Sequence, residues 1–365
     1  MVHYTLQLDL VTTLYFGIRN TDDYGRLWLS NPHQDHIFQN LYTSLLTSHL
    51  HVIPDGDMFM SSSEAPVFHA ILRALMPGPI LLTDKQGQHD PALINRFVGQ
   101  TRSGKQVILK TDDPVRPVQN RLFDRECREG GRGGALVGSV YLPRVKSSII
   151  GSWNVRENHV DNRVDDWLTA QDLRDAFPDA LSAEEYLIYK PGYCSDSAWA
   201  IWNLQKDKDE GQVMHITLNH LAAETVLVVP IHSAALPVGD KGDLQMVKVA
   251  VCGLVDKFAG LVGVTGMNLS SGTSRVPSPD VQWKQANMFP PSFHHRERPD
   301  EAFLQSKMHR HLRSIHPTSF RTPWTDRPGR QHAHRIRPAR NHGTGAGTGV
   351  VYVYIPYRAA PRCTS

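Results

Sequence analysis

Up to about residue 85, short apolar runs alternate with longer stretches in which apolar residues recur every three or four positions. Short runs between polar turns are typical of buried strands, and the longer spacing is typical of amphipathic helices. Carboxylates follow each predicted strand. The pattern predicts βα units of a parallel sheet or barrel, with strands at Leu14–Ile18, Leu50–Ile53 and Ile80–Leu82 and helices at Ile37–Leu45 and from Pro66 to about Leu75.

The second of these helices has a recognisable start signal. Ser61 is followed three residues later by Glu64, which is the spacing of a capping box, where each side chain bonds the other residue's backbone N–H group. Pro66 suits the first helical turn, because its missing N–H would have no partner there. We therefore predict that Ser61 and Glu64 cap this helix.

From about residue 105 to 265 the period changes to that of strands. Short β-prone runs are separated by Gly, Asp and Asn, and Val238–Asp243 forms a plausible turn between the last two. This pattern favours an antiparallel β-sandwich over further βα units. We expect one short surface helix at Trp167–Phe177. The predicted strands are Ala135–Leu142, Ser148–Val155, Glu185–Lys190, Val213–Leu218, Thr225–Pro230 and Met246–Val255.

From about residue 267 onward the regular spacing of apolar residues is lost. Residues 294–365 contain thirteen Lys and Arg against four Asp and Glu, together with many Pro and His. Such a composition predicts a disordered basic tail. The chain is therefore expected to be α/β with three parts, namely the last three βα units of a (β/α)8 (TIM) barrel at 1–104, a β-sandwich domain at 105–266, and a low-order tail at 267–365.

Composition narrows the classes of partner. Four cysteines without Cys-x-x-Cys spacing indicate neither a zinc site nor a disulfide framework. The tail pair His332 and His334 lacks supporting carboxylates, so neither a metal nor a cofactor is expected. Basic residues of the tail are not interleaved with stacking aromatics, so no nucleic-acid partner is expected. No secretory signal and no run of about 18 apolar residues is present, so a cytoplasmic protein without a membrane partner is expected.

The candidate chemistry lies where the predicted strands end. Reactive groups of βα barrels occupy this position. A single Asp there can simply cap the following helix, but five carboxylates repel one another unless a ligand or a cation such as Arg19 offsets them. Such a cluster suits a sugar site, where an oxocarbenium-like transition state favours negative surroundings. The carboxylates are Asp22, Asp23, Asp55, Asp57 and Asp84.

Several motifs follow one another along the chain in a family-like order. They cover about residues 14 to 262, roughly two thirds of the chain. In this order they resemble the raffinose synthase and seed imbibition protein group of glycoside hydrolase family 36, whose members are α-galactosidase-like. The motifs are Arg19–Tyr24, Pro54–Phe59, Phe68–Ala70 and Gly78–His89, followed by Arg121–Asp124, Gly151–Asn154 and Gly253–Phe258.

The resemblance implies a retaining α-galactosidase-type mechanism on an α-galactoside. The general acid/base of the family, four residues after the strand-end Arg, falls on Asp23, and a one-residue slip in the alignment would move it to Asp22. Arg19, Asp57 and the adjacent Met58 match positions that line the galactose pocket.

Two further candidates for substrate binding, Asp84 and His69, match motifs of the group. Their roles are less defined by the resemblance than those of the pocket residues. His69 lies on a predicted helix, where it can equally be a hydrogen-bonded core histidine.

The chain departs from the family pattern at the nucleophile. That residue is an Asp in a Lys-Val-Asp-like motif, and no such motif precedes Arg19. Retention of configuration needs a second carboxyl group about 5–5.5 Å from the first. Gly56 also replaces the family's tryptophan between the two Asp. These departures predict an N-terminally truncated member that is inactive as it stands.

Three functions stay open at this point. One is an α-galactosidase, which hydrolyses its substrate, and another is a galactosyltransferase that moves galactose from galactinol to sucrose. Both would use the same carboxylates and differ in whether water or a sugar hydroxyl enters. The third is a non-catalytic sugar-binding or interaction protein that retains the β domain.

Overall fold

The computed structural model divides the chain into two compact units. One contains Met1–Lys284 with Ile336–Ser365, and the other, Gln285–Arg335, lies entirely outside the described residues. The described residues are 17–25, 31–50, 52–101, 105–124, 126–129, 133–157, 162–178, 181–191, 198–205, 211–238, 243–254, 256–268, 280–283 and 350–356.

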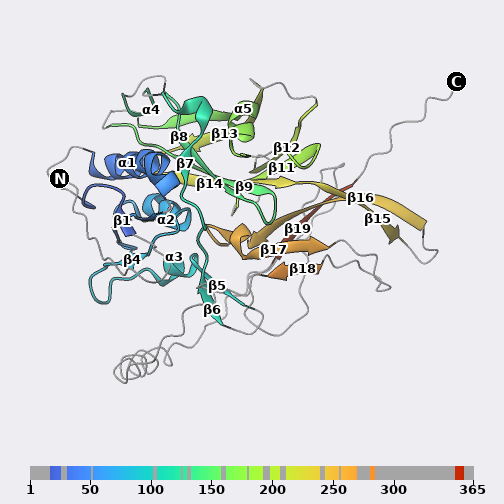
Figure 1. Cartoon of the computed structure of the whole chain (residues 1–365), viewed down its shortest axis with the longest axis horizontal. Helices are drawn as coiled ribbons and strands as arrows, with labels where there is room; N and C mark the ends of the chain where they lie inside the picture. Colours follow the sequence, from blue (N-terminus) through green and yellow to red (C-terminus); the bar gives the residue numbers. More distant parts are fainter. Residues whose placement is uncertain are drawn as a thin grey trace, which may run out of the picture. The chain divides into compact units, whose positions relative to one another are not determined.

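Strands and helices alternate in the first part of the chain (Figure 1). Strands β1 and β2 pair in parallel, with Arg19 opposite Asp55, and β3 and β4 also pair in parallel. The elements are β1 (Gly17–Arg19), α1 (Pro32–Thr47), η1 (Ser48–Leu50), β2 (Ile53–Asp55), β3 (Met58–Phe59), α2 (Pro66–Ala74), β4 (Leu81–Leu82), α3 (Pro91–Asn95) and β5 (Val98–Gln100).

These parallel ladders confirm the predicted parallel pairing, with three corrections. The strand predicted at Leu50–Ile53 lies further along the chain, at Ile53–Asp55, because Ser48–Leu50 form a 3-10 turn after α1. The strand at 81–82 pairs with β3 and not with β2, because the chain resumes an extended course after Asp57. It is also not buried, since Leu81 and Leu82 are 43% and 41% exposed. Closure into a barrel stays a prediction, as does the predicted strand at Leu14–Ile18 before Gly17.

A six-stranded sheet with the strand order β12-β11-β14-β9-β8-β7 dominates the middle of the chain. All its ladders are antiparallel, as the sequence predicted for this zone. Its strands are β7 (Arg116–Pro117), β8 (Leu136–Leu142), β9 (Ser147–Trp153), β11 (Glu185–Tyr189), β12 (Trp199–Asn203) and β14 (Ala223–Pro230).

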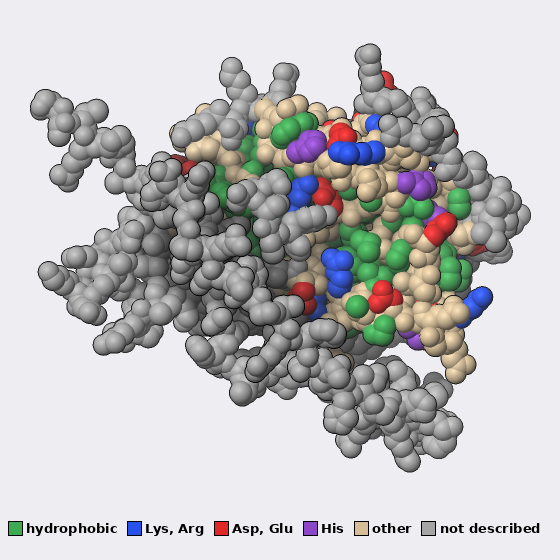
Figure 2. Space-filling view, turned by 180° about the vertical axis from the view of Figure 1, so that it is seen from behind, with side chains coloured by type: hydrophobic (Ala, Val, Ile, Leu, Met, Phe, Trp, Pro, Cys, Tyr) green, Lys and Arg blue, Asp and Glu red, His purple; other side chains and the backbone are tan. Residues whose placement is uncertain are grey.

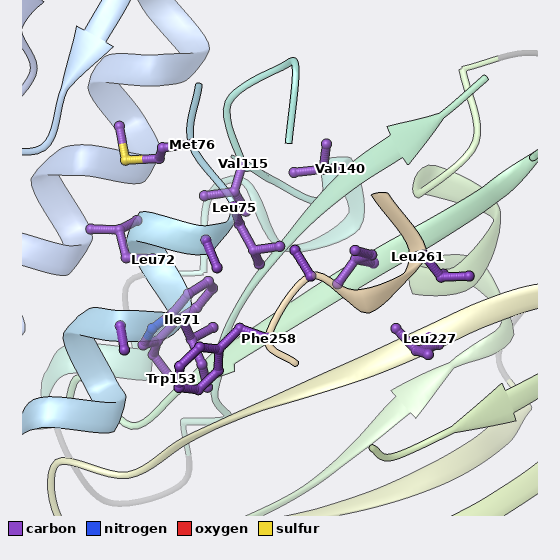
Figure 3. Packing of buried hydrophobic residues seen from close by; sticks show 14 of the residues in the cluster. Ile71, Leu72, Leu75, Met76, Val115, Val140, Trp153, Leu227, Phe258 and Leu261 are labelled. Atoms are coloured by element: carbon purple, nitrogen blue, oxygen red, sulfur yellow. The ribbon is translucent and has the colours of Figure 1, made fainter. Parts of the chain in front are cut away.

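Both faces of this sheet are covered, and every residue of its central strand β9 is buried. Alternate residues point to opposite faces of a strand. On β9, Ile149 and Trp153 therefore face the cluster formed with α1 and α2, whereas Ile150 faces a second cluster. Figure 3 shows Ile71 of α2 beside Trp153 and Phe258 in the first cluster. The predicted barrel units and the predicted β domain thus share one core, although their boundaries stay predictions.

The second cluster lies between the sheet and the antiparallel pair of β10 (Val164–Thr169) and β13 (Gln212–Leu218). The short helix α5 (Ala170–Asp175) covers the same side and begins with a capping box made by Thr169 and Asp172. The predicted helix at Trp167–Phe177 is therefore shorter than expected, because Trp167 to Thr169 still belong to β10. A complete β-sandwich stays a prediction.

The remaining elements extend this unit. Strand β16 pairs with β15 on one side and β19 on the other. Two strands, β18 and β19, fall within the predicted tail, whose other residues from 269 onward, including His332 and His334, lie outside the described part. The elements are β6 (Gln106–Ile108), η2 (Gln119–Arg121), α4 (Glu126–Glu129), β15 (His232–Val238), β16 (Asp243–Leu254), η4 (Gly260–Gly263), β17 (Val264–Asn268), β18 (Asp280–Trp283) and β19 (Val350–Pro356).

The predicted capping box of α2 is wrong. The helix begins four residues later than a Ser61 cap would require, with Ala65 as its N-cap and Pro66 in its first turn. The hydroxyl of Ser61 instead donates to Asp84, and Glu64 contacts His33.

Candidate functional site

Arg19 joins two of the predicted site residues at the end of the β1–β2 ladder. Its Nη2 lies 2.9 Å from Oδ1 of Asp23 and 2.5 Å from Oδ2 of Asp57. The Asp23 side chain is 69% exposed, whereas that of Asp57 is only 7% exposed. One guanidinium nitrogen therefore holds an exposed and a buried carboxylate side by side.

Asp57 is fixed by bonds from both sides of this edge. Its Oδ2 accepts a hydrogen bond of 2.6 Å from the backbone N–H of Tyr24. Its own N–H donates to Oδ1 of Asp55 at 2.9 Å, and its φ is +70°. A non-glycine residue in the left-handed region is uncommon and persists only where its surroundings hold it. This loop therefore fixes the direction of the Asp57 side chain.

Two other predicted residues of this region, Asp22 and Met58, lie next to the pair in the sequence. Asp22 is exposed, and its backbone N–H donates to Gln39 at 3.0 Å. The side chain of Met58, next to Asp57, is partly exposed. Both could meet a ligand that reaches Asp23.

Asp84 follows β4 and has its own set of partners. It accepts hydrogen bonds from the hydroxyls of Ser61 and Ser62 at 2.7 and 3.0 Å, and it lies 3.2 Å from Nδ1 of His89. Burial raises the pKa of Asp84, but hydrogen bonds from Ser61, His89 and Ser62 outweigh burial and lower it below its usual value. Asp84 is thus held as a carboxylate by residues other than Arg19.

His69 lies in a buried group of rings. Its ring centroid is 4.7 Å from that of Tyr24, 5.0 Å from that of His33 and 5.4 Å from that of His36. Nε2 of His69 and Nδ1 of His33 are 2.8 Å apart. His69 is fully buried on α2, so it supports the loops behind the carboxylates and does not reach their exposed edge.

Burial sets the charge of this ring cluster. It lowers the pKa of His36 and His69 well below the usual value, and the nearby Arg73 cation lowers both further. Both histidines are therefore neutral at pH 7. Burial also lowers the pKa of Arg73, to about 10, so this guanidinium remains charged.

Sequence reasoning missed Arg73, which lies behind the Asp57 loop. It is 2% exposed, its Nη2 donates to the carbonyl oxygens of Gly56 and Met58, and it lies 3.0 Å from Nε2 of His36. An Arg on an amphipathic helix is ordinarily solvated, so its position gave no local signal. One clue in the sequence was Gly56, which stands where the family has a tryptophan. Without that side chain, the space next to Gly56 can hold the Arg73 side chain.

Charges on the visible surface are mixed in sign. On the face shown in Figure 2, Lys and Arg side chains lie among Asp and Glu side chains. Within the described ranges, no group of three or more His, Cys, Asp or Glu residues is arranged to hold a metal ion. No described helix is long and apolar enough to cross a membrane.

Comparison with known proteins gives a family match over part of the chain. Residues 13–157 match the model of raffinose synthase or seed imbibition protein Sip1. A probable galactinol–sucrose galactosyltransferase 5 of Arabidopsis thaliana is 35% identical over 109 residues, which are 30% of this chain and 13% of that protein. Stachyose synthase of Pisum sativum is 38% identical over 113 residues, 30% of this chain and 12% of that protein.

A solved structure is also similar, at a much lower level. The α-galactosidase I of Mortierella vinacea has a TM-score of 0.35 and 10% identity, over 59% of this chain and 53% of that chain. That score is too low for a common fold to follow. The stretch matched to the curated relatives spans about an eighth of their length, and the family match at residues 13–157 contains Arg19, Asp23, Asp57 and Asp84. Over residues 13–157, this chain is therefore similar to raffinose synthases and seed imbibition proteins.

Proposed function

We propose that the Arg19–Asp23–Asp57 edge binds the galactosyl unit of an α-galactoside. The observation that carries this proposal is the single Arg19 nitrogen that lies between Asp23 and Asp57. A buried carboxylate in a fixed direction is suited to accept hydrogen bonds from sugar hydroxyls, while an exposed one beside it can reach the glycosidic oxygen. The exposed Met58 adds an apolar contact for a face of the sugar ring.

The two carboxylates would have different roles. Asp23 is the candidate general acid/base, because it is exposed and an entering or leaving group could reach it. Asp22, one residue earlier, is the alternative. Asp57 and Arg19 would hold the sugar, since Asp57 is buried and accepts a hydrogen bond from the N–H of Tyr24, and the half-buried Arg19 pairs with Asp57.

The transfer of galactose to a sugar hydroxyl is favoured over hydrolysis by the names of the relatives. These proteins are called galactinol–sucrose galactosyltransferases and stachyose synthase. Hydrolysis remains the second candidate, because transfer and hydrolysis share the first half of a retaining reaction and differ only in the acceptor.

Among the described residues of this edge, the carboxylate that would attack is not identified. A retaining reaction needs one carboxyl group that attacks and one that donates a proton. Asp57 is a poor candidate for attack, because its carboxylate accepts bonds from Arg19 and from the Tyr24 amide and is buried. A sugar-binding protein that does not turn over its galactoside is therefore the third candidate.

Calorimetric titration of the full chain with methyl α-D-galactopyranoside tests the binding proposal. We expect binding, and weaker binding of the C4 epimer, methyl α-D-glucopyranoside. Asp57→Asn should raise the dissociation constant about tenfold, because it removes a charged hydrogen-bond acceptor. Asp165→Asn, which changes an exposed carboxylate on β10, is the matched control and should not alter binding.

Incubation with galactinol and sucrose, and separately with an aryl α-galactoside, distinguishes the candidates. Raffinose formation would support a transferase, and release of galactose would support a hydrolase. Turnover by either route that is abolished by Asp23→Asn would show that another carboxylate attacks. Absence of any galactoside binding by the folded chain would refute the proposed function.

A further inference from the structure

Arg73 is a buried cation that lies beside His36 and donates to two carbonyl oxygens of a single loop. Its Nη2 donates to the carbonyl oxygen of Gly56 and, at 2.8 Å, to that of Met58. These two carbonyls lie on either side of Asp57. The guanidinium therefore spans the residue whose side chain faces Arg19.

The same loop carries the unusual backbone. Asp57 has a φ of +70°, a conformation that needs support from its surroundings. The Asp55 side chain supplies one bond to its N–H group. The two bonds from Arg73 fix the peptide groups on either side of Asp57. The loop is therefore held both by the Asp55 side chain and by Arg73 in the core.

The backbone of Gly56 lies close to the Arg73 side chain. A Cβ built on Gly56 would lie 3.5 Å from Nε and 3.6 Å from Cζ of Arg73, and 3.4 Å from the sulfur of Met76. These are ordinary van der Waals distances, so the space between the loop and the guanidinium is about that of one methyl group. His36 closes the other side, with Nε2 at 3.0 Å from the Gly56 oxygen.

Arg73 contributes less to stability than its burial suggests. Its Nε and Nη1 are buried and have no hydrogen-bond partner among the described residues. Burial of a cation is costly, and each unpaired donor adds to that cost. A methionine of similar length would avoid both costs. The arrangement is therefore better explained by the orientation it gives the loop than by the free energy of folding.

We propose that Arg73 is a positioning residue that fixes Asp57 toward Arg19 and so sets the geometry for binding the galactosyl unit. The proposal rests on the proposed function for its second half only. Arg73 acts through the Gly56 and Met58 carbonyls on Asp57, and Asp57 then accepts from Arg19 and from the N–H of Tyr24. The exchange of the Tyr24 amide proton reports the first half, and sugar affinity reports the second.

The experiment compares wild type, Arg73→Lys and Arg73→Met in the full chain. Amide exchange at Tyr24 is measured by NMR, and the dissociation constant for methyl α-D-galactopyranoside is measured by calorimetry. In Arg73→Met the loop loses its charged donor. We therefore expect Tyr24 exchange to become about tenfold faster relative to amides of the six-stranded sheet, and the dissociation constant to rise about tenfold. Arg73→Lys should fall between the two, since an ammonium can reach the same oxygens from a shorter side chain.

Lys190→Met is the matched control. Lys190 is also a buried cation that donates to a carbonyl, that of His215, and it pairs with Glu224 in the other half of the unit. It should leave both Tyr24 exchange and the dissociation constant unchanged. If Arg73→Met does not fold, the proposal is tested by comparing Arg73→Lys with wild type. Tyr24 exchange should then be at least about threefold faster in Arg73→Lys, because the donor is misplaced.

Unchanged Tyr24 exchange in folded Arg73→Met, or in Arg73→Lys where the Met variant does not fold, would overturn the proposal. An equal effect of Lys190→Met would also overturn it, because the response would then reflect general loss of stability. Faster Tyr24 exchange in a chain whose wild type binds no galactoside would keep the loop-fixing role and reject only the proposed function.

Discussion

The buried ring cluster predicts that the protein loses stability when the pH falls from 7 to 5.5. His36 and His69 are buried, and burial with the Arg73 charge lowers the pKa of both well below 6.5. The unfolded chain binds a proton at each histidine below pH 6.5, whereas the folded chain does not. The unfolded state is therefore favoured as the pH falls, and nothing is lost above this range.

The size of the effect follows from this difference in proton binding. Going from pH 7 to 5.5 should lower the free energy of unfolding by about 1.3 kcal/mol for each histidine, about 2.5 kcal/mol for both. Nearby charges act in the same direction, since Arg73 contributes at both rings and Arg19 at His36. His232, whose pKa is lowered by burial and by Lys146, adds to the slope.

Urea unfolding followed by circular dichroism at several pH values between 7 and 5.5 measures this slope. His69→Gln should lower stability at pH 7 and reduce the slope by about 1.3 kcal/mol over the range, because one proton fewer is taken up. His49→Gln, at an exposed position, controls for loss of a histidine as such. A free energy of unfolding that stays constant over this range would refute the neutral, buried state of the cluster.

Two further substitutions test polar contacts beside the two hydrophobic clusters. Arg121→Met should destabilise the protein by about 3–5 kcal/mol in urea unfolding, because Arg121 pairs with Asp166 and, at 2.6 Å, with the fully buried Asp172; a loss below 1 kcal/mol would contradict it. Trp153→Phe should cost about 2–3 kcal/mol, because the buried indole donates to the Phe68 carbonyl at 3.0 Å; an unchanged urea midpoint would show that β9 and α2 do not depend on this bond.

The elements predicted well from sequence are those with a strong local pattern. Helix α1 was predicted from its apolar spacing, and Ile37 and Leu41 are fully buried. The long strands β8 and β9 were predicted within a few residues, because runs of β-prone residues are bounded by turns. Local pattern was sufficient there, since the same residues that favour the element also supply its buried face.

Prediction failed where a side chain bonds a residue that is distant in the sequence. Ser61 and Glu64 have the spacing of a cap, but Ser61 bonds Asp84, which is 23 positions away, and Glu64 contacts His33. Strand β10 was read partly as helix because its outer face carries Asp165 and Trp167 among charged residues, while its buried side packs against β13 and the sheet. Such tertiary partners are invisible in a single sequence.

The repulsion among the strand-end carboxylates is offset by different groups at two separate positions. The parallel register puts Arg19 opposite Asp55 and close to Asp23 and Asp57, so one cation offsets the carboxylates at this edge. Asp84 instead receives hydroxyl and imidazole donors. The sequence argument required a compensating cation and predicted Arg19, but it could not predict that a second cation, Arg73, would be placed beneath the loop. Arg73 lies on helix α2, whose apolar pattern does not require a charged residue. Its burial there is explained by the loop that it bonds.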